Sequence, residues 1–445
     1  MSQFKFSSQV DKNKIFIVQK SEIEGRVDPY FYNPNFRVNN RNLFKTLNEF
    51  SRYILHPPEY LREFSDGGVQ LIRSQNVRPA GISIDENPVF FSAEFLKDKK
   101  HSFAKKGDVL IVRSGVNAGD VAVIEVDMTN AIVGADTLLC RCSDNLIPKF
   151  LQVYFYTDFG KAQILKHITG TTNKHLNGEN LKKVLIPNIT LEAQRKTISI
   201  FEKSLEVNRQ KEQQAKLLLA GIDAYLLTEL GITLPQQDNT FPKRIFKSNF
   251  SELIGQRFDP SWYFNFHYRI EGGKFPNFSL GDIAFVSKGQ SISSAKIEAG
   301  LYPVVAGGQS SPYKHHVFNH EGNVITVSAS GAYAGYVWYH ETPIFASDCS
   351  VIGSKNEDEI KTLFLAEILK LKQKEIYYLQ QGAGQPHVYS RDLIRLKIPV
   401  PPKSIQLKIL RHIDSIRTNA KQLQTEAAQI LADAKAEIEC MILGE

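Results

Sequence analysis

The chain has 445 residues, a net charge of +7 and a pI of about 8.9. Its length predicts roughly two to four domains, and a mean hydropathy of -0.25 with 42% apolar residues fits globular domains with buried cores. No apolar stretch reaches the roughly 18 residues that span a bilayer, and residues 1–10 lack the charged-then-apolar order of a signal peptide, so we expect a cytoplasmic protein. The mild basic excess permits binding to nucleic acid, but many enzymes are as basic.

The first half of the chain predicts a small sheet domain that runs into a long helix. Apolar runs bounded by Gly, Asn and Ser at 109–112 and 121–126 predict buried strands, and a helix is expected over 148–167. A second, proline-free helix is expected over about 191–230. Its apolar residues follow a three- and four-residue spacing, with polar interruptions between them: Ile198, Phe201, Leu205, Ala215, Leu219, Ile222 and Leu226.

The second half shows the same order of elements after a polar linker at 233–240. Strands are expected at 324–327 and 336–339, and a helix over 357–379. Another proline-free helix covers about 404–443. Its apolar residues hold the same spacing: Ile413, Ile416, Ala420, Leu423, Ala427, Ile430, Ala434 and Met441.

Three ordered matches relate the two halves of the chain. Residues 15–29 match 245–260 at an offset of 230, or 231 after one inserted residue, and the strand and glycine turn at 107–119 match 322–335. The last match pairs residues separated by 212 positions: Gly170, His175, Leu181, Ile186, Pro187 and Gln194 with Gly382, His387, Leu393, Ile398, Pro399 and Gln406. A falling offset indicates two copies of one large unit whose middle parts differ in length.

The first copy is predicted to carry extra material at about 39–67, which includes His56-Pro57-Pro58. This segment could read DNA, contact a partner or only extend the fold.

Either long helix alone would fit a surface helix packed on its own domain. Two equally long helices at equivalent places most simply pack on each other and hold the two globular units apart. At 1.5 Å per residue, each helix would be roughly 60 Å long.

A search for catalytic motifs finds no phosphate-binding loop and no His-Glu-x-x-His zinc motif. His315, His316 and His320 cluster, but no nearby carboxylate or cysteine completes a convincing ligand set, which favours a solvated or phosphate-facing loop over a metal site. The four scattered cysteines are interpreted as reduced thiols, some of them buried. We therefore expect no catalytic residue and no metal site.

Two segments, 33–36 and 259–262, resemble the [Asn/Asp]-Pro-Pro-[aromatic] motif of amino-methyltransferases. Both lack the second proline, and neither lies in a strand–helix domain with a glycine-rich turn for S-adenosylmethionine. Asp28-Pro29 and Asp259-Pro260 are better interpreted as matched helix starts, with Asp as the cap and Pro in the first turn.

The duplicated motifs together resemble the specificity subunit of Type I restriction-modification systems, over essentially the whole chain. The resemblance depends on segments 169–176, 185–187 and 192–195, and on their copies at 382–387 and 398–401 with Gln406. It implies an α+β chain with two similar α/β target-recognition domains separated by two long helices that form an antiparallel coiled coil. The implied bounds are 1–190 and 248–400 for the domains, 191–232 and 401–445 for the helices, and 233–247 for the linker.

The resemblance also implies a non-catalytic, DNA-binding role. Each domain would read one half of a bipartite site, and two methyltransferase subunits would dock on the chain, joined by motor-nuclease subunits in the full complex. Adenine methylation with S-adenosylmethionine, and cleavage driven by ATP with Mg²⁺, would belong to those partners, and this chain would hold no cofactor.

The predicted DNA-contacting residues are polar side chains of glycine-flanked loops, because Arg, Gln and Asn can hold base edges while Lys holds phosphates. An ordinary solvated loop is the alternative for each of them. In the first domain they are Arg73, Ser74, Gln75, Asn76, Arg78, Arg113 and Lys174. In the second they are Lys288, Gln290, Gln309, Ser310, Tyr313, Lys314, His315 and His316. The frame shared by both copies includes Asn173, Lys174, His175, Gln385 and His387. These residues are expected to support the structure or to contact the DNA backbone.

Three other functions stay open at this point. The chain could serve a different modification or phage-defence complex, or act as a coiled-coil scaffold for proteins without a DNA role. An autonomous methyltransferase would instead bind S-adenosylmethionine by itself. A steep salt dependence of DNA affinity would separate the DNA-binding functions from the scaffold.

Overall fold

The computed structural model describes most of the chain as two compact units. Unit 1 comprises residues 1–212 and 424–445, and unit 2 comprises residues 213–423. The described residues are 10–11, 15–23, 29–33, 37–38, 40–78, 81–85, 87–97, 102–128, 130–170, 174–235, 240–241, 245, 247, 249, 265, 268–382 and 384–444.

Unit 1 contains a four-stranded antiparallel sheet in the order β2-β10-β7-β8 and a three-stranded sheet in the order β6-β3-β9. Two further pairs, β1 with β11 and β4 with β5, complete its strands among the described residues. The strands are β1 Phe44–Thr46, β2 Ser51–Leu55, β3 Val69–Ile72, β4 Val77–Arg78, β5 Gly81–Ile82, β6 Phe90–Phe91, β7 Asp108–Val112, β8 Val121–Val123, β9 Ala131–Val133, β10 Thr137–Cys142 and β11 Leu185–Pro187. The helices are η1 Lys20–Glu22, η2 Pro29–Tyr32, η4 Arg41–Leu43, α1 Leu47–Phe50, η5 Ser74–Asn76, α2 Ala93–Leu96, α3 Pro148–Tyr156, α4 Asp158–Leu165, α5 Gly178–Lys182 and the start of α6 Leu191–Leu230.

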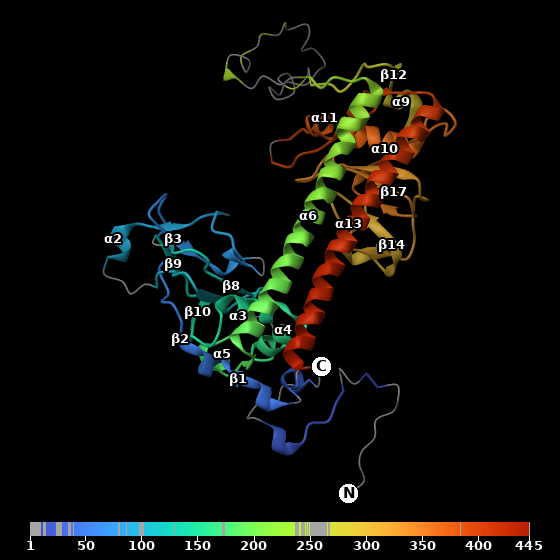
Figure 1. The fold of residues 1–445 in the computed structure, drawn as a ribbon. Coiled ribbons are helices and arrows are strands. Elements are labelled where there is room, and N and C mark those ends of the chain that lie inside the picture. Colours follow the sequence, from blue (N-terminus) through green and yellow to red (C-terminus); the bar gives the residue numbers. More distant parts are fainter. Residues whose placement is uncertain are drawn as a thin grey trace. The chain divides into compact units, whose positions relative to one another are not determined.

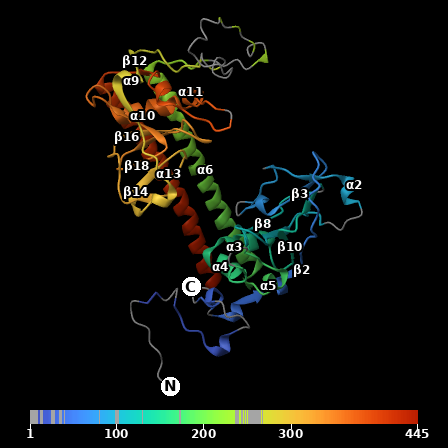
Figure 2. The same ribbon diagram turned by 180° about the vertical axis from the view of Figure 1, so that it is seen from behind.

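Unit 2 repeats this plan with a four-stranded sheet in the order β13-β19-β16-β17 and a three-stranded sheet in the order β15-β14-β18. Its strands are β12 Asn277–Ser279, β13 Ala284–Lys288, β14 Ala299–Val305, β15 Lys314–His315, β16 Val324–Ser328, β17 Val337–His340, β18 Phe345–Ala346, β19 Cys349–Ser354 and β20 Lys397–Pro399. Its helices are α9 Leu280–Ile283, η7 Ser294–Lys296, α10 Thr362–Leu371, α11 Gln373–Tyr377, α12 Ser390–Leu393 and the start of α13 Lys403–Leu443. Within unit 2, α10 lies beside strands β16 and β17 (Figures 1 and 2).

The duplication predicted from the sequence is confirmed at the level of strand pairing. Strand β1 pairs with β11 as β12 pairs with β20, and β3 pairs in parallel with β9 as β14 does with β18. The predicted strands at 109–112, 121–126, 324–327 and 336–339 correspond to β7, β8, β16 and β17.

The two shorter predicted helices differ from the expectation. The helix expected over 148–167 divides at Thr157, whose extended backbone ends α3 and whose hydroxyl accepts a hydrogen bond from Gly160 N at 3.1 Å to begin α4. The one expected over 357–379 begins only at Thr362 and divides into α10 and α11.

The expectation of extra material at about 39–67 is wrong. Strands β1 and β2 with α1 between them are the counterparts of β12, β13 and α9, so this part belongs to the shared fold. The copies instead differ in length between two pairs of equivalent strands. In unit 1, the end of β3 at Ile72 lies 40 positions before the end of β7 at Val112. In unit 2, the end of β14 at Val305 lies only 23 positions before the end of β16 at Ser328. The additional segment of unit 1 therefore lies within 73–107.

Each unit's hydrophobic core takes in the beginning of one long helix and the end of the other. The core of unit 1 includes Phe201 from α6 and Ile438 and Ile442 from the end of α13. The core of unit 2 includes Leu226 and Leu230 from the end of α6, with Ile409 and Ile413 from the beginning of α13. At roughly 1.5–3 kcal/mol for each fully buried large apolar side chain, both helices are strongly held.

The two long helices run antiparallel within each unit, as the resemblance to the specificity subunits implied (Figures 1 and 2). In unit 1, Asn208 Nδ2 donates to Ala427 O at 2.9 Å, and Lys211 forms an ion pair with Glu426 at 2.6 Å. The coiled-coil prediction is thus confirmed, although Leu219, which was placed in the apolar seam, is 38% exposed.

One buried glutamine fixes the first turn of each long helix to its sheet domain. Gln194 accepts a hydrogen bond from Ile147 N at 2.8 Å and donates to Asn145 O and Ile189 O. Gln406 accepts from Lys361 N at 2.9 Å and donates to Glu359 O and Pro401 O. Both side chains are fully buried, so water cannot replace these hydrogen bonds. Each amide therefore keeps its hydrogen-bond partners only when the helix stays in this position.

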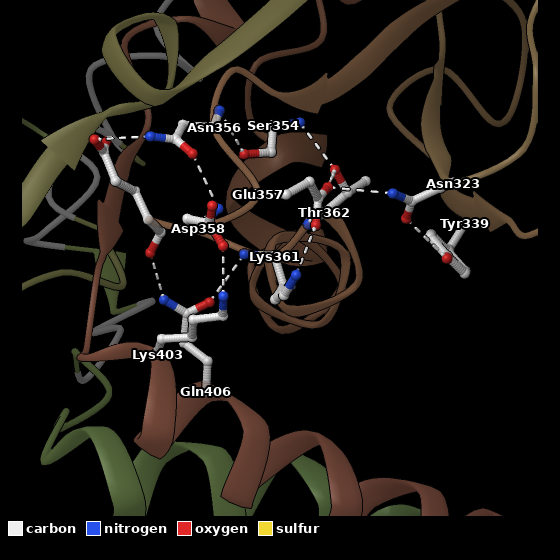
Figure 3. A network of polar contacts seen from close by, with 11 residues as sticks. Asn323, Tyr339, Ser354, Asn356, Glu357, Asp358, Lys361, Thr362, Lys403 and Gln406 are labelled. Carbon is white, nitrogen blue, oxygen red and sulfur yellow. Dashed lines mark hydrogen bonds and ion pairs between the residues drawn. The ribbon is translucent and has the colours of Figure 1, made fainter.

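In unit 2 a polar network surrounds this glutamine (Figure 3). Lys403 forms an ion pair with Asp358, and Glu357 Oε1 accepts hydrogen bonds from Thr362 N at 3.1 Å and Thr362 Oγ1 at 2.6 Å. Asn323 Nδ2 also donates to Glu357, at 3.2 Å. The network therefore holds the loop that the glutamine contacts.

Several sequence predictions fall wholly or partly outside the described residues. Asp28, Asp259 and Pro260 lie outside them, as do residues 34–36 and Asn173, while Pro29 begins η2.

None of the four cysteines forms a disulfide, and Cys140, Cys142 and Cys349 are buried. Within the described residues, no helix is long and apolar enough to cross a membrane.

Replacing Gln406 by alanine is expected to destabilise unit 2 by roughly 2–4 kcal/mol, because three buried backbone groups lose their partners. A Trp262→Phe background leaves Trp338 of β17 as the only tryptophan, so its fluorescence during urea unfolding reports on unit 2. The control is Gln214→Ala, which removes an exposed amide from α6. Equal stabilities of the two variants would contradict the anchoring role of Gln406.

His340 should make unit 2 sensitive to acid. Its imidazole is buried on β17 beside Thr326 Oγ1 at 2.8 Å, and this burial lowers its pKa from 6.5 to about 4. Because the unfolded chain takes up this proton at higher pH than the folded chain, stability is full above pH 6.5 and falls as the pH drops toward 4.

We expect the free energy of unfolding of unit 2 to fall by roughly 2–3 kcal/mol more between pH 7 and pH 4.5 in the wild type than in His340→Gln. Urea titrations followed by Trp338 fluorescence, in the same Trp262→Phe background, measure this difference. Parallel pH curves for the two proteins would refute the assignment.

Candidate nucleic-acid interface

In both units, polar loops leave the same end of a parallel strand pair. In unit 1 the pair is β3 with β9, and Gly134 N donates to Ile72 O at 2.9 Å where β3 ends. In unit 2 the pair is β14 with β18, and Ser347 N donates to Val305 O at 2.7 Å. The predicted residues 73–76 and 309–310 follow these two strand ends, so the fold places them at corresponding sites.

The loop after β3 is shaped by Asn76. This side chain is 3% exposed, accepts a hydrogen bond from Arg73 N at 2.9 Å and donates to Ser83 O at 2.7 Å. Arg73 is half-buried and donates to Asn87 O at 2.5 Å, whereas Gln75 is exposed. Asn76 was predicted to face DNA, but its burial and both hydrogen bonds give it a structural position inside the loop. Gln75 is the residue of this turn that faces solvent.

An open hollow of about 500 Å³ lies beside this loop in unit 1. The hollow brings the predicted residues Ser74 and Lys174 together, and Lys174 is exposed. It is lined by Ser74, Ser114, Gly115, Asp136, Lys174 and His175.

A serine–aspartate pair forms the wall of this hollow and recurs in unit 2. Ser114 Oγ donates to Asp136 Oδ1 at 2.8 Å, and Ser330 Oγ donates to Asp348 Oδ2. Sequence reasoning did not identify either pair. The signal available was the repeated Ser-Gly at the start of each glycine turn, but the aspartates are 22 and 18 positions further along the chain.

Two histidines complete the shared frame through their backbones. His175 pairs with Thr169 and bridges to Ser114, and His387 pairs with Gln381 and bridges to Ser330. Among the described residues, neither imidazole hydrogen-bonds to the serine, and each aspartate contacts the serine hydroxyl directly. The arrangement therefore differs from a nucleophilic triad, in which the histidine stands between the other two groups.

Two nitrogen-bearing side chains lie at the Ala135 carbonyl of unit 1. Arg113 Nη1 donates to Ala135 O at 3.3 Å, and His56 Nε2 lies 3.0 Å from the same oxygen. Burial and then the positive charge of Arg113 lower the pKa of His175, so its ring is neutral at pH 7. Arg78, also predicted, is half-buried and its guanidinium donates to Val77 O at 3.3 Å.

In unit 2 the predicted residues occupy two neighbouring loops. Gln290 N donates to Ala346 O at 2.9 Å, which places the loop after β13 at the end of β18, next to the loop between β14 and β15. The predicted side chains exposed in this region are Lys288, Gln290, Gln309, Ser310, Tyr313, Lys314 and His316.

His315 is the exception among the predicted residues of unit 2. It is 5% exposed, its Nδ1 accepts a hydrogen bond from Glu298 N at 3.1 Å, and its ring packs against Phe345. His315 was predicted to face DNA, but its buried side chain instead supports the hairpin of β14 and β15. Within the described residues, no three His, Cys, Asp or Glu side chains are placed to hold a metal ion.

Solved structures show a related fold. A chain solved in work on complex assembly and conformational transition of the type I restriction-modification system matches with a TM-score of 0.55 and 16% identity, covering 90% of this chain and 96% of that one.

Sequence comparisons give two relatives. A protein of Methanocaldococcus jannaschii, named as the specificity subunit of a type I restriction enzyme, is 24% identical over 76% of this chain and 78% of its own length. A protein of Mycoplasma pneumoniae, named as a type I specificity subunit, is 26% identical over 34% of this chain, and the match spans 42% of that relative's length.

The family model of the type I restriction modification DNA specificity domain matches twice, at residues 70–217 and 273–431. These two matches together cover more than half of the 445 residues, and each includes one serine–aspartate pair with the loops beside it. The chain therefore belongs to the type I restriction-modification specificity family.

Proposed function

We propose that this chain reads a bipartite DNA sequence and directs partner subunits to it, without catalysing a reaction itself. The observation that carries the proposal is the duplicated frame, in which one backbone arrangement presents two chemically different loop sets at corresponding strand ends. Two loop sets with different side chains, held on equivalent frames, suit a DNA site whose two halves differ in sequence.

The exposed loop residues are suited to the contacts that such reading requires. Gln75, Gln290 and Gln309 have amides that can pair with the edge of adenine, while Lys288, Lys314 and Lys174 can contact phosphates. Among the remaining predicted residues, Arg73, Arg78 and Arg113 are half-buried, and Ser74, Ser310, Tyr313 and His316 border the same loops. The buried Asn76 and His315 are proposed only to hold these loops in place.

The long helices support a spacer role. A 40-residue helix is about 60 Å long, which exceeds the roughly 34 Å that separates half-sites one DNA turn apart. We propose that two methyltransferase subunits bind this chain and carry S-adenosylmethionine, and that motor-nuclease subunits join them with ATP and Mg²⁺.

A genome-wide map of N6-methyladenine tests this proposal in cells that carry the chain and its neighbouring methyltransferase subunit. Deleting only this chain should remove one bipartite motif with an unspecified gap, and exchanging residues 248–400 for those of a relative should change one half of that motif. Unchanged methylation, with the methyltransferase shown to be expressed and active, would refute the proposed function.

Single loop residues should alter only one half-site. Gln309→Ala in unit 2 is expected to reduce methylation at sites with the wild-type second half by roughly tenfold, since a good bidentate base contact contributes about 1–3 kcal/mol. Gln75→Ala should act on the other half. Gln214→Ala, an exposed amide of α6, is the control for both. Competition between duplexes that differ in one half-site measures the effect, and equal losses at both halves would argue against separate readers.

A further inference from the structure

The two units build one backbone frame but place different charges on it. Arg113 N donates to Asp136 O at 2.8 Å, as Ala329 N does to Asp348 O at 3.1 Å. The carbonyls of Arg113 and Ala329 then accept from Leu176 N at 2.8 Å and Val388 N at 3.0 Å, respectively. Arg113 and Ala329 therefore occupy equivalent positions.

A second pair of equivalent positions lies beside the first. Gly115 N donates to Lys174 O at 3.2 Å, and Gly331 N donates to Pro386 O at 3.0 Å. Unit 1 thus has an arginine and a lysine where unit 2 has an alanine and a proline, although the surrounding backbone hydrogen bonds are the same.

In unit 1 Lys174 and Ser114, the residue after Arg113, line the open hollow of about 500 Å³. Lys174 lines it, is exposed and has no carboxylate partner among the described residues. Arg113 precedes Ser114, which lines the hollow, and its guanidinium donates to the carbonyl of Ala135. Asp136 lines the same hollow, and its carboxylate accepts a hydrogen bond from the hydroxyl of Ser114.

The hollow also has a neutral donor suited to an anionic oxygen, the hydroxyl of Ser74 from the loop after β3. The His56 ring, from the segment that follows β2, lies at the Ala135 carbonyl. His175 is neutral at pH 7, so the positive charge of the hollow comes from Lys174 and Arg113.

We propose that this hollow binds a phosphodiester group of the DNA backbone through Lys174 and Arg113, and that the equivalent place in unit 2 does not. The inference rests on the proposed DNA-reading function and adds an asymmetry to it. Unit 1 fixes its half-site partly by this phosphate, whereas unit 2 presents the uncharged Ala329 and Pro386 at the same frame positions.

The salt dependence of affinity tests the proposal, because each neutralised phosphate contributes about 0.9 to the slope of log affinity against log salt concentration. The probe is a long duplex of random sequence, and the protein is the full chain purified with its methyltransferase subunit. Lys174→Gln is expected to lower the slope by roughly 0.9, while Lys174→Arg keeps it. Equal thermal unfolding of the variants shows that the fold is intact.

The matched control is Lys408→Gln, which removes the same charge from α13, where Lys408 pairs with Glu229 at 3.0 Å. Its slope should equal that of the wild type. If the salt slope falls equally in Lys174→Gln and Lys408→Gln, the change comes from the net charge of the protein, and the phosphate site is overturned. An unchanged slope in Lys174→Gln would overturn it while leaving DNA binding intact, and a wild-type complex without salt-dependent affinity would refute the proposed function itself.

Discussion

The fold depends on how each long helix is fixed to its sheet domain by a buried glutamine at the fourth helical residue. The amides of Gln194 and Gln406 each bond three backbone groups of the adjoining loops, away from water. A rotation or a one-turn slide of the helix would leave these groups without partners, at roughly 1–3 kcal/mol each. The helix therefore has one register relative to its domain, and the loops after β3 and β14 keep a fixed relation to the helix of their own unit.

The antiparallel pairing of the helices follows from the duplication. Each unit fixes the first turn of one helix, and its core takes in the last turns of the other, with Ile438 and Ile442 in unit 1 and Leu226 and Leu230 in unit 2. Two copies of one arrangement can meet this condition only when the helices run in opposite directions. Ala215, Ala420 and Ala427 are buried residues of the long helices, and such small side chains permit close approach of helix backbones.

The sequence predicted the features that depend on strong local patterns. The long helices and the strands β7, β8, β16 and β17 were predicted because their apolar periodicity extends over whole elements. The counterpart relation of α1 and α9 was missed because they share burial but few residue identities. Asn76 and His315 are polar residues in loop-like segments, so only tertiary contacts reveal that they are buried. The serine–aspartate pairs were missed for the same reason, since hydrogen bonds between strands leave no periodic signal.

The frame around each serine–aspartate pair is held mainly by backbone hydrogen bonds, and this explains how the two units can differ chemically. A backbone donor or acceptor is present whatever the side chain, so Arg113 and Ala329, or Lys174 and Pro386, fill equivalent positions without loss of the shared contacts. The side chains that carry the fold are elsewhere, in the cores and at the two glutamines. At these frame positions the backbone atoms hold the fold and the side chains are free to differ, so the charge and hydrogen-bonding character of one unit can change while its fold stays constant.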